Sequence, residues 1–145
     1  MRTADAIVVG GGPAGSTCAR KLRQAGLEVL VLDKATFPRT KLCAGWVTPE
    51  VLSDLELDPG DYPYSFMTFD ALTLHLNFLS IAPGTRQHSI RRYEFDDFLL
   101  QRAGAEVVEH TVKSVREDRG DYVIDESFRC RYLVGAAGTA CPVYR

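Results

Sequence analysis

Residues 6–15 read Ala-Ile-Val-Val-Gly-Gly-Gly-Pro-Ala-Gly, and residues 29–33 read Val-Leu-Val-Leu-Asp. Short apolar runs that are bounded by turn residues are typical of buried strands. Pro13 suits the first turn of a helix, and Gly26 is a suitable helix end. The pattern therefore predicts a strand, a tight turn, a helix and a second strand. We expect the helix to bury the residues at helical spacing, which are Ala14, Cys18, Leu22 and Ala25.

Three glycines in the turn, Gly10, Gly12 and Gly15, fit the spacing G-x-G-x-x-G. In that fingerprint the first glycine permits the tight turn, the second lets a phosphate approach the backbone, and the third lets the helix pack closely on the sheet. The helix then directs free N–H groups and the positive end of its dipole at the phosphates. Asp33, 18 positions after Gly15, would accept hydrogen bonds from ribose hydroxyls. The sequence thus predicts a dinucleotide site; the alternative is a glycine-rich turn that binds no nucleotide.

The composition limits the class of protein. The chain has 145 residues, of which 46% are hydrophobic and 25% charged, and these values are typical of one globular domain. A net charge of -2 supplies no basic field for nucleic acid. No apolar run approaches the roughly 20 residues of a membrane-spanning helix, and the first strand begins too near Met1 for a signal peptide, so we expect a cytoplasmic protein. The four cysteines lack zinc-site spacing, which predicts free thiols and no metal site.

The rest of the chain predicts further elements. A loop over 34–47 leads to a short helix that begins at Thr48-Pro49, and another helix is expected over about 94–103. Alternation from Leu72 to Phe78 predicts a half-buried strand, with a bulge near Ala71. Shorter strands are predicted at 106–109, 111–118, 122–126 and 128–132, before a return to the parallel sheet at 133–136. The fold class is therefore α/β, with a parallel sheet plus an antiparallel β-meander. A second glycine turn at 137–139 follows the returning strand and is expected near the first, because ligands bind at the carboxyl ends of such strands.

Five segments occur in a specific order: Gly10 to Gly15; Asp33-Lys34; Phe37 to Gly45; Arg92 to Asp96; and Val134 to Gly138. Their order and spacing resemble the FAD-dependent geranylgeranyl reductase family, which belongs with the aromatic hydroxylases of the p-hydroxybenzoate hydroxylase type. The resemblance covers nearly the whole chain. It implies FAD as the cofactor and a Rossmann-like FAD-binding domain over 1–145, with about 64–92 contributing part of a substrate-domain sheet. Family members continue with a Gly-Asp motif and the rest of that domain, so we expect this chain to be the N-terminal portion and its cofactor site to be incomplete.

The resemblance also implies roles for particular positions. The first glycine turn would hold the FAD pyrophosphate, Asp33 the adenosine ribose, and Val112 the adenine through its backbone. The loop from Arg39 to Gly45 would pass over the ribityl and isoalloxazine side, and Arg92 would contact the phosphate or ribityl region. The implied cofactor-binding residues are Gly10, Gly12, Pro13, Ala14, Gly15, Asp33, Lys34, Arg39, Lys41, Cys43, Ala44, Gly45, Arg92, Val112 and Gly138.

One motif departs from the hydroxylase pattern. Ala137 stands where hydroxylases carry Asp, and Cys141 stands where they carry Ser. This difference argues against the hydroxylase branch and favours an oxidoreductase that reduces carbon–carbon double bonds of an isoprenoid. The alternatives are a flavin monooxygenase or halogenase, and a non-catalytic binding module. The implied partners are a small-molecule or lipid-like substrate, NAD(P)H or a ferredoxin-type electron donor, and a membrane surface at its periphery. No acid–base catalyst is predicted, because the flavin itself carries hydride transfer.

Several side chains keep two interpretations at this point. Cys43 is either close to the flavin or an ordinary loop thiol. Arg39 and Lys41 either screen the pyrophosphate or are exposed, and Arg92 is either a cofactor contact or a solvated arginine. Trp46 either lines a flavin or lipid pocket or anchors its loop. The three histidines, His75, His88 and His110, show no partner pattern and are predicted to be structural or on the surface.

Overall fold

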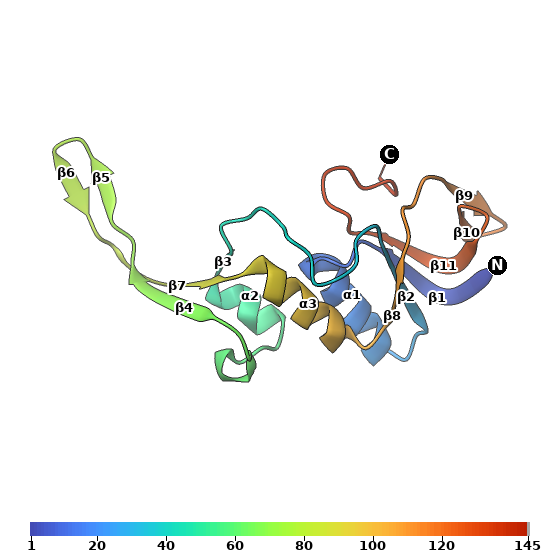
Figure 1. Ribbon diagram of the computed structural model, residues 1–145, viewed down its shortest axis with the longest axis horizontal. Coiled ribbons are helices and arrows are strands. Elements are labelled where there is room, and N and C mark those ends of the chain that lie inside the picture. Colours follow the sequence, from blue (N-terminus) through green and yellow to red (C-terminus); the bar gives the residue numbers. More distant parts are fainter. Residues whose placement is uncertain (145) are drawn as a thin grey trace. The chain divides into compact units, whose positions relative to one another are not determined.

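The computed structural model describes residues 1–144 (Figure 1). The chain divides into two compact units. The large unit contains residues 1–39 and the chain from Asp96 onward, and the small unit contains residues 40–95. No helix of the described chain is both long enough and apolar enough to cross a membrane.

The large unit is built on one six-stranded sheet with the order β8-β2-β1-β11-β10-β9. Its strands are β1 (Arg2–Val9), β2 (Val29–Asp33), β8 (Glu106–Glu109), β9 (Val115–Asp118), β10 (Asp121–Ile124) and β11 (Phe128–Gly135). The four strands β8, β2, β1 and β11 are parallel, and β10 and β9 continue the sheet in antiparallel order. Helix α1 (Pro13–Gln24) connects β1 to β2, and α3 (Arg92–Ala103) precedes β8. The predicted α/β class, with a parallel sheet and an antiparallel meander, is confirmed.

The second half of β1 and most of β2 are buried on both faces. On one face Ile7, Val9 and Leu32 form a core with residues of the meander, including Ile124 and Phe128. On the other face the alternate residues of β1 and β2 form a second core with residues of α1 and α3: Ala6, Val8, Ala19, Val29, Val31, Leu100 and Ala103. Successive side chains of a strand point to opposite faces, so a continuous apolar run supplies both cores.

The predicted buried face of α1 is partly wrong. Its buried residues are Gly15, Ser16 and Ala19, whereas Ala14 and Ala25 are exposed. Only Cys18 and Leu22 of the predicted stripe pack against the core, and both are partly buried. The reason is the close approach at Gly15, which turns this position rather than Ala14 toward the sheet. The predicted end at Gly26 holds, because Gly26 follows the helix with a φ of +86°.

Strand β11 pairs with a strand on each of its sides, whereas the sequence pattern predicts two separate segments here. Its residues pair in parallel with β1 over the whole length, from Arg2 opposite Phe128 to Val9 opposite Gly135. The first part of the same strand pairs antiparallel with β10. The predicted third meander strand and the predicted return to the parallel sheet are therefore one strand.

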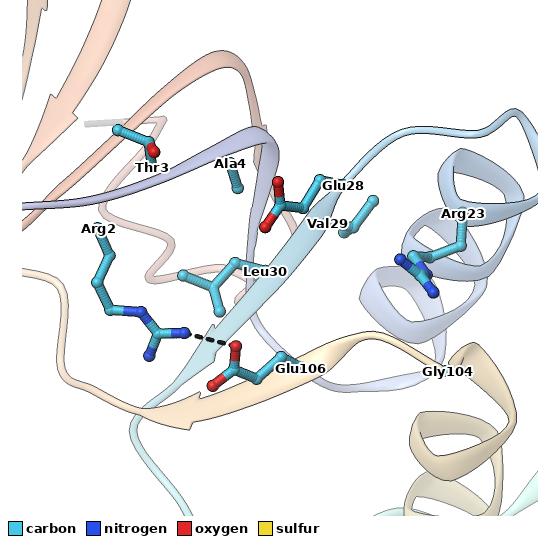
Figure 2. Close-up of a pocket in the computed structure, with 9 residues that line it drawn as sticks. All are labelled: Arg2, Thr3, Ala4, Arg23, Glu28, Val29, Leu30, Gly104 and Glu106. Atoms are coloured by element: carbon cyan, nitrogen blue, oxygen red, sulfur yellow. Dashed lines mark hydrogen bonds and ion pairs between the residues drawn. The ribbon is translucent and has the colours of Figure 1, made fainter.

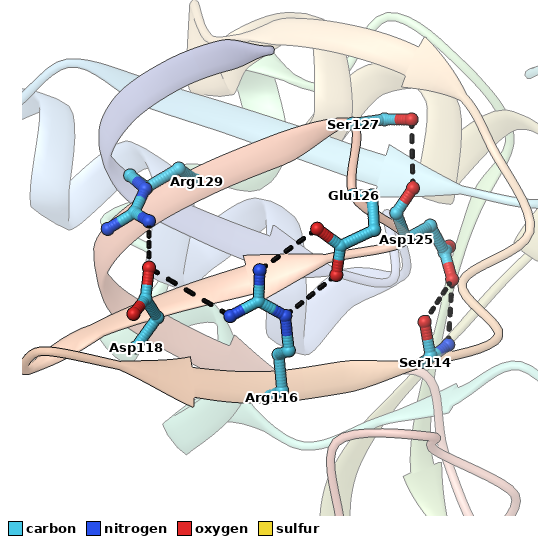
Figure 3. Close-up of polar contacts among 7 residues, drawn as sticks. All are labelled: Ser114, Arg116, Asp118, Asp125, Glu126, Ser127 and Arg129. Atoms are coloured by element: carbon cyan, nitrogen blue, oxygen red, sulfur yellow. Dashed lines mark hydrogen bonds and ion pairs between the residues drawn. The ribbon is translucent and has the colours of Figure 1, made fainter.

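Ion pairs between charged side chains connect the strands of the meander on its surface (Figure 3). Arg116 donates from Nε to Glu126 Oε1 over 2.7 Å and from Nη2 to Glu126 Oε2 over 2.9 Å. Arg129 pairs with Asp118 and Asp121, which flank the turn of the β9–β10 hairpin. That turn has positive φ at Arg119 and Gly120, so the hairpin predicted around Arg119-Gly120-Asp121 is confirmed.

The small unit contains a three-stranded antiparallel sheet with the order β3-β7-β4. Its elements are β3 (Trp46–Val47), α2 (Pro49–Asp54), the 3-10 helix η1 (Pro59–Asp61), β4 (Phe66–Ala71), β5 (Leu74–Leu76), β6 (Leu79–Ile81), β7 (Gly84–Ile90) and the start of α3. The predicted short helix after Thr48 and the predicted irregularity near Ala71 are both present, the latter as a register shift between Phe69 and Ala71.

The two faces of the β3-β7-β4 sheet differ. Val47 and His88 are paired in register on one face and are buried there, and α2 packs against β7. On the other face Trp46 and Met67 are both paired with Ser89, and Phe69 is paired with Gln87. Trp46, Met67 and Phe69 are exposed large side chains. We call these three residues the open apolar face.

The predicted half-buried strand from Leu72 to Phe78 is wrong. Asn77 has a φ of +47° and, with Phe78, forms the turn between β5 and β6 (Figure 1). The four aliphatic residues of these strands pair in register on one face, and all are exposed: Leu74, Leu76, Leu79 and Ile81. His75 and Ser80 form a hydrogen bond of 2.8 Å on the other face. The alternation of apolar and polar residues does not reveal that Asn77 adopts a left-handed backbone conformation, which divides this run into the two strands of a hairpin.

Candidate dinucleotide site

The site begins where two glycine turns meet at the carboxyl ends of β1 and β11. The Ala136 amide donates to the Val9 carbonyl over 2.8 Å. Gly10 has a φ of +110°, and a Cβ there would lie 2.6 Å from the Ala136 carbonyl carbon. Only glycine fits this contact, so the prediction that the second turn lies near the first is confirmed. A parallel sheet binds ligands at this edge, where neighbouring strands lead to connections on opposite sides.

The start of α1 is open to an anion. Gly12 is the N-cap residue with extended backbone, Pro13 is the first helical residue, and the N-cap residue supplies no side-chain hydrogen bond. The Ser16 amide already donates to the Gly12 carbonyl over 2.9 Å. The amides of Ala14 and Gly15 belong to the first turn, where the helix itself offers no acceptor. A diphosphate can accept hydrogen bonds from these amides, and the positive end of the dipole of this 12-residue helix attracts it.

Gly15 and Gly12 have different functions in the turn. A Cβ on Gly15 would lie 1.8 Å from the Gly10 carbonyl oxygen, so this glycine is required for packing the helix against the strand. A Cβ on Gly12 would have only Arg39 Nη2 nearby, at 3.4 Å. The protein alone would tolerate a side chain there, whereas a phosphate that approaches the backbone would not. The structure thus has the cradle that a pyrophosphate requires.

Asp33 ends β2 and fixes the first glycine turn. Its Oδ2 accepts from the Gly11 amide over 2.7 Å, and its Oδ1 accepts from the Ala35 amide over 2.9 Å. The sequence predicts a contact of this residue with the ribose, but it does not indicate this structural role. A carboxylate has about four acceptor positions, so two backbone amides leave capacity for ribose hydroxyls.

Arg39 lies beside the same turn. Its guanidinium lies over the Phe37 ring, 4.8 Å from the ring centre, and this ring would lie 3.2 Å from a Cβ on Gly11. Arg39 Nη2 is 3.3 Å from Asp96 Oδ2. The motif from Arg92 to Asp96 contains this acid but does not by itself indicate a role for it. A signal was present: positions 96, 99, 100 and 103 share a helix face, and the three others are Leu99, Leu100 and Ala103.

The segment after β8 completes this edge of the sheet. The His110 amide donates to the Asp33 carbonyl over 2.7 Å, and Val112 is buried in the same core as Leu32. His110 Nε2 is 2.7 Å from Asp125 Oδ2, so this histidine has a partner in the segment that follows β10. Burial raises the pKa of Asp125, but hydrogen bonds from His110 and from the neighbouring backbone outweigh that effect and hold the pKa below its ordinary value of 3.8.

The structure places the remaining predicted cofactor residues as follows. Lys34 is exposed after β2, and Gly138 is exposed with a φ of +81° in the second glycine turn. Lys41, Cys43, Ala44, Gly45 and Arg92 belong to the small unit. Of these, Cys43 is exposed and Arg92 is the partly buried first residue of α3.

Two small-unit residues have clear local roles. Gly45 has a φ of +71°, and a Cβ there would lie 2.0 Å from the Ile90 carbonyl oxygen, so this glycine is required for packing on β7. The Trp46 indole donates to Gln87 Oε1 over 2.7 Å, while 56% of the residue remains exposed. Trp46 is therefore anchored by its polar end with its ring on the open apolar face.

A cavity of about 300 Å³ lies at the opposite edge of the large sheet (Figure 2). It is lined by the first residues of β1, β2 and β8, and Arg2 pairs with Glu106 across it at 2.5 Å. The amino ends of parallel strands are remote from the ligand edge, so this cavity is separate from the dinucleotide site. Among residues 1–144 no group of three or more His, Cys, Asp or Glu side chains is arranged to hold a metal ion.

Residues 8–69 match the family described as NAD(P)-binding Rossmann-like domain. An uncharacterized protein of Methanosarcina barkeri is 36% identical over 149 residues, which cover 96% of this chain and 38% of that protein. The geranylgeranyl diphosphate reductase of Rhodobacter capsulatus is 32% identical over 147 residues, which cover 92% of this chain and 37% of the reductase. Residues 8–69 thus match a Rossmann-like nucleotide-binding domain, and the proteins similar to nearly the whole chain include a geranylgeranyl diphosphate reductase and a flavin-dependent halogenase.

The flavin-dependent brominase Bmp2 is a solved structure to which the chain is similar. Its structure matches 94% of the chain and 38% of the brominase, with a TM-score of 0.76 and 26% identity. The predicted Rossmann-like fold is confirmed, and the flavin-dependent enzymes among the similar proteins agree with the predicted cofactor, FAD. The chain spans less than two fifths of the length of the relatives named here.

Proposed function

We propose that this chain binds FAD through the two glycine turns and Asp33, and that the flavoprotein containing it reduces carbon–carbon double bonds of an isoprenoid or a related lipid-like substrate. The observation that carries the proposal is the cradle at Gly12. The uncapped start of α1 and the nearby Arg39 supply donors for the diphosphate, and Asp33 supplies acceptors for the ribose. Electrons would come from NAD(P)H or a ferredoxin-type donor.

The residues of the chain act by binding and orientation. Bound FAD supplies hydride transfer. The amides of Ala14 and Gly15 hold the diphosphate, and the backbone after β8 at Val112 lies at the edge proposed for the adenine. The loop with Lys41, Cys43, Ala44 and Gly45, together with Lys34, Arg92 and Gly138, is proposed to complete the contacts with the cofactor. No side chain of the chain is assigned as a catalytic acid or base.

The open apolar face supports a lipid-like substrate. Trp46, Met67 and Phe69 expose large apolar side chains on the same face of one sheet, with Ser89 of β7 between Trp46 and Met67. A group of exposed large apolar side chains supports a site for an apolar ligand or partner. We propose this face, within residues 64–92 and β3, as part of the substrate-binding sheet. A flavin-dependent halogenase is the second candidate, and the similarity to the brominase favours it. A non-catalytic binding module is the third.

Flavin retention tests the proposal. The purified chain is mixed with FAD and passed through a gel-filtration column, and the absorbance spectrum of the protein peak is recorded. We expect the flavin bands to elute with the protein; a protein peak without flavin would contradict FAD binding. In the flavoprotein that contains this chain, saturation of an isoprenoid alkene supports the reductase, whereas an oxygen-dependent halogenated or hydroxylated product would establish the second candidate instead.

A further inference from the structure

Asp96 is a charged residue in the interior of the large unit. It is 0% exposed, and it belongs to the helix face that otherwise carries Leu99, Leu100 and Ala103 into the core. A buried carboxylate is costly unless cationic or hydrogen-bonding partners compensate for its lost hydration. An apolar residue at this position would serve the packing of α3 on the sheet. The presence of an acid therefore calls for a reason besides packing.

The neighbourhood of Asp96 supplies that reason. Its Oδ2 is 3.3 Å from Arg39 Nη2, and the Arg39 side chain is only 19% exposed. The Phe37 ring supports the guanidinium from one side at 4.8 Å. The same Nη2 lies 3.4 Å from the position that a Cβ of Gly12 would occupy, which is where a phosphate is expected to approach. The Arg39 guanidinium is therefore held between the Asp96 carboxylate, the Phe37 ring and the glycine turn.

We propose that Asp96 is a positioning residue, which holds the Arg39 guanidinium at the glycine turn so that Arg39 can contact the diphosphate of FAD. This inference rests on the proposed function. A guanidinium has five N–H donors in a rigid fork, so a pair with one carboxylate leaves donors for phosphate oxygens. A long side chain that is already held in its bound conformation loses little rotamer freedom when the ligand arrives.

Asp96 also has an effect of the opposite sign. Its negative charge repels a diphosphate, and in a buried setting this repulsion is weakly screened. If positioning dominates, then removal of the charge weakens FAD binding; if repulsion dominates, then removal strengthens it. The direction of the change in affinity therefore separates the two effects.

The test compares the FAD dissociation constants of the wild-type chain, Asp96→Asn and Asp97→Asn by flavin fluorescence. Asn keeps the shape of Asp without its charge. Asp97 is the matched control because it neighbours Asp96 on α3 and accepts instead from Gln101 over 2.7 Å. We expect Asp96→Asn to weaken FAD binding by about tenfold and Asp97→Asn to leave it unchanged, in proteins whose circular dichroism shows that they are folded.

A double-mutant cycle shows whether Asp96 acts through Arg39. In the Arg39→Ala background, Asp96→Asn should cause no further loss of FAD affinity. A role that is only structural would lower the stability of the apo chain and leave the affinity of the folded protein unchanged. The inference is overturned if Asp96→Asn binds FAD as tightly as the wild type or tighter, or if its full effect persists without Arg39.

If Asp96→Asn does not fold, the Arg39→Lys variant is used for the measurement of FAD affinity instead. It keeps the charge but removes the fork, so we expect a loss of FAD affinity of about tenfold. Wild-type affinity in this variant would overturn the inference. A wild-type chain that binds no FAD refutes the proposed function itself, whereas a wild-type chain that binds FAD with unaffected variants refutes only the role of Asp96.

Discussion

Strands β1 and β2 of the large unit and strands β5 and β6 of the small unit are both rich in Leu, Val and Ile, but their surroundings are opposite. The apolar residues of β1 and β2, from Ala6 to Val9 and from Val29 to Leu32, are at most 4% exposed. The aliphatic residues of β5 and β6 are 44–58% exposed, and Phe78 in their turn is 98% exposed. An isolated two-stranded hairpin has no layer to cover its apolar face. Apolar composition therefore predicts a strand, whereas burial depends on the elements that pack on it.

Truncation of a core strand should have the largest effect on stability. Leu32 is 0% exposed and belongs to the core shared with the meander. We expect Leu32→Ala to lower the free energy of unfolding by about 3 kcal/mol, because it removes buried methyl groups and leaves a cavity. Urea denaturation followed by circular dichroism measures the change. A loss below about 1 kcal/mol would show that the core of the large unit is less well packed than the structure indicates.

Thiol reactivity provides a second comparison of the two units. Burial raises the pKa of the Cys130 thiol in β11 to about 11. Cys43 in the small unit is exposed. Because only the thiolate reacts, we expect alkylation of Cys130 by iodoacetamide at pH 8 to be at least about 100-fold slower than alkylation of Cys43. Peptide mass spectrometry over a time course measures both rates, and equal rates would contradict the burial of β11.

The pH dependence of stability tests the polar contacts of the meander. The pKa of Asp125 is lowered in the folded chain, so its charged form contributes stability that is complete above the ordinary value of 3.8 and is lost as the pH falls through the folded value. Asp125→Asn should lower stability at pH 7 by on the order of 1 kcal/mol, because contacts with His110 and Ser114 are weakened. The difference from the wild type should shrink as the pH falls below about 4. A difference that is constant from pH 7 to pH 3 would exclude this electrostatic origin.

Truncation of the hairpin should have the smallest effect. Leu76 is 58% exposed in β5, and Leu76→Ala has the same chemistry as Leu32→Ala. We expect a change in the free energy of unfolding within about 0.5 kcal/mol, which is typical of surface substitutions. The same urea titration measures both variants. A loss comparable to that of Leu32→Ala would mean that another surface covers the hairpin in solution.

Local signals in the sequence were sufficient for much of the large unit. The order of strand, glycine turn, helix and strand from Ala6 to Asp33 follows from short-range patterns, and the structure contains each element. The errors have two causes: one is a packing contact between a helix and the sheet, and the other is a local backbone conformation that alternation does not reveal. The buried face of α1 is set by the approach of Gly15 to the sheet, and the position of the hairpin turn is set by the left-handed backbone of Asn77.

The candidate site shows the same limit. Gly10, Gly12 and Gly15 could be identified because their spacing is local. The contact of Gly10 with Ala136 joins positions far apart in the chain, and it was expected only from the rule that ligands bind at the carboxyl ends of parallel strands. The pair of Arg39 and Asp96 had no local signature apart from an acid on an apolar helix face.

The FAD affinity of Gly12→Ala, compared with Gly84→Ala, tests the central claim most directly. Gly12 has a φ of -70° and Gly84 has no neighbouring heavy atom within 4 Å of an added Cβ, so both variants should fold as the wild type does. We expect Gly12→Ala to weaken FAD binding at least about tenfold, because its methyl group occupies the place of the phosphate, and Gly84→Ala to bind as the wild type does. Equal FAD affinity of the wild type and a folded Gly12→Ala variant would contradict the assignment of this glycine turn as the pyrophosphate site.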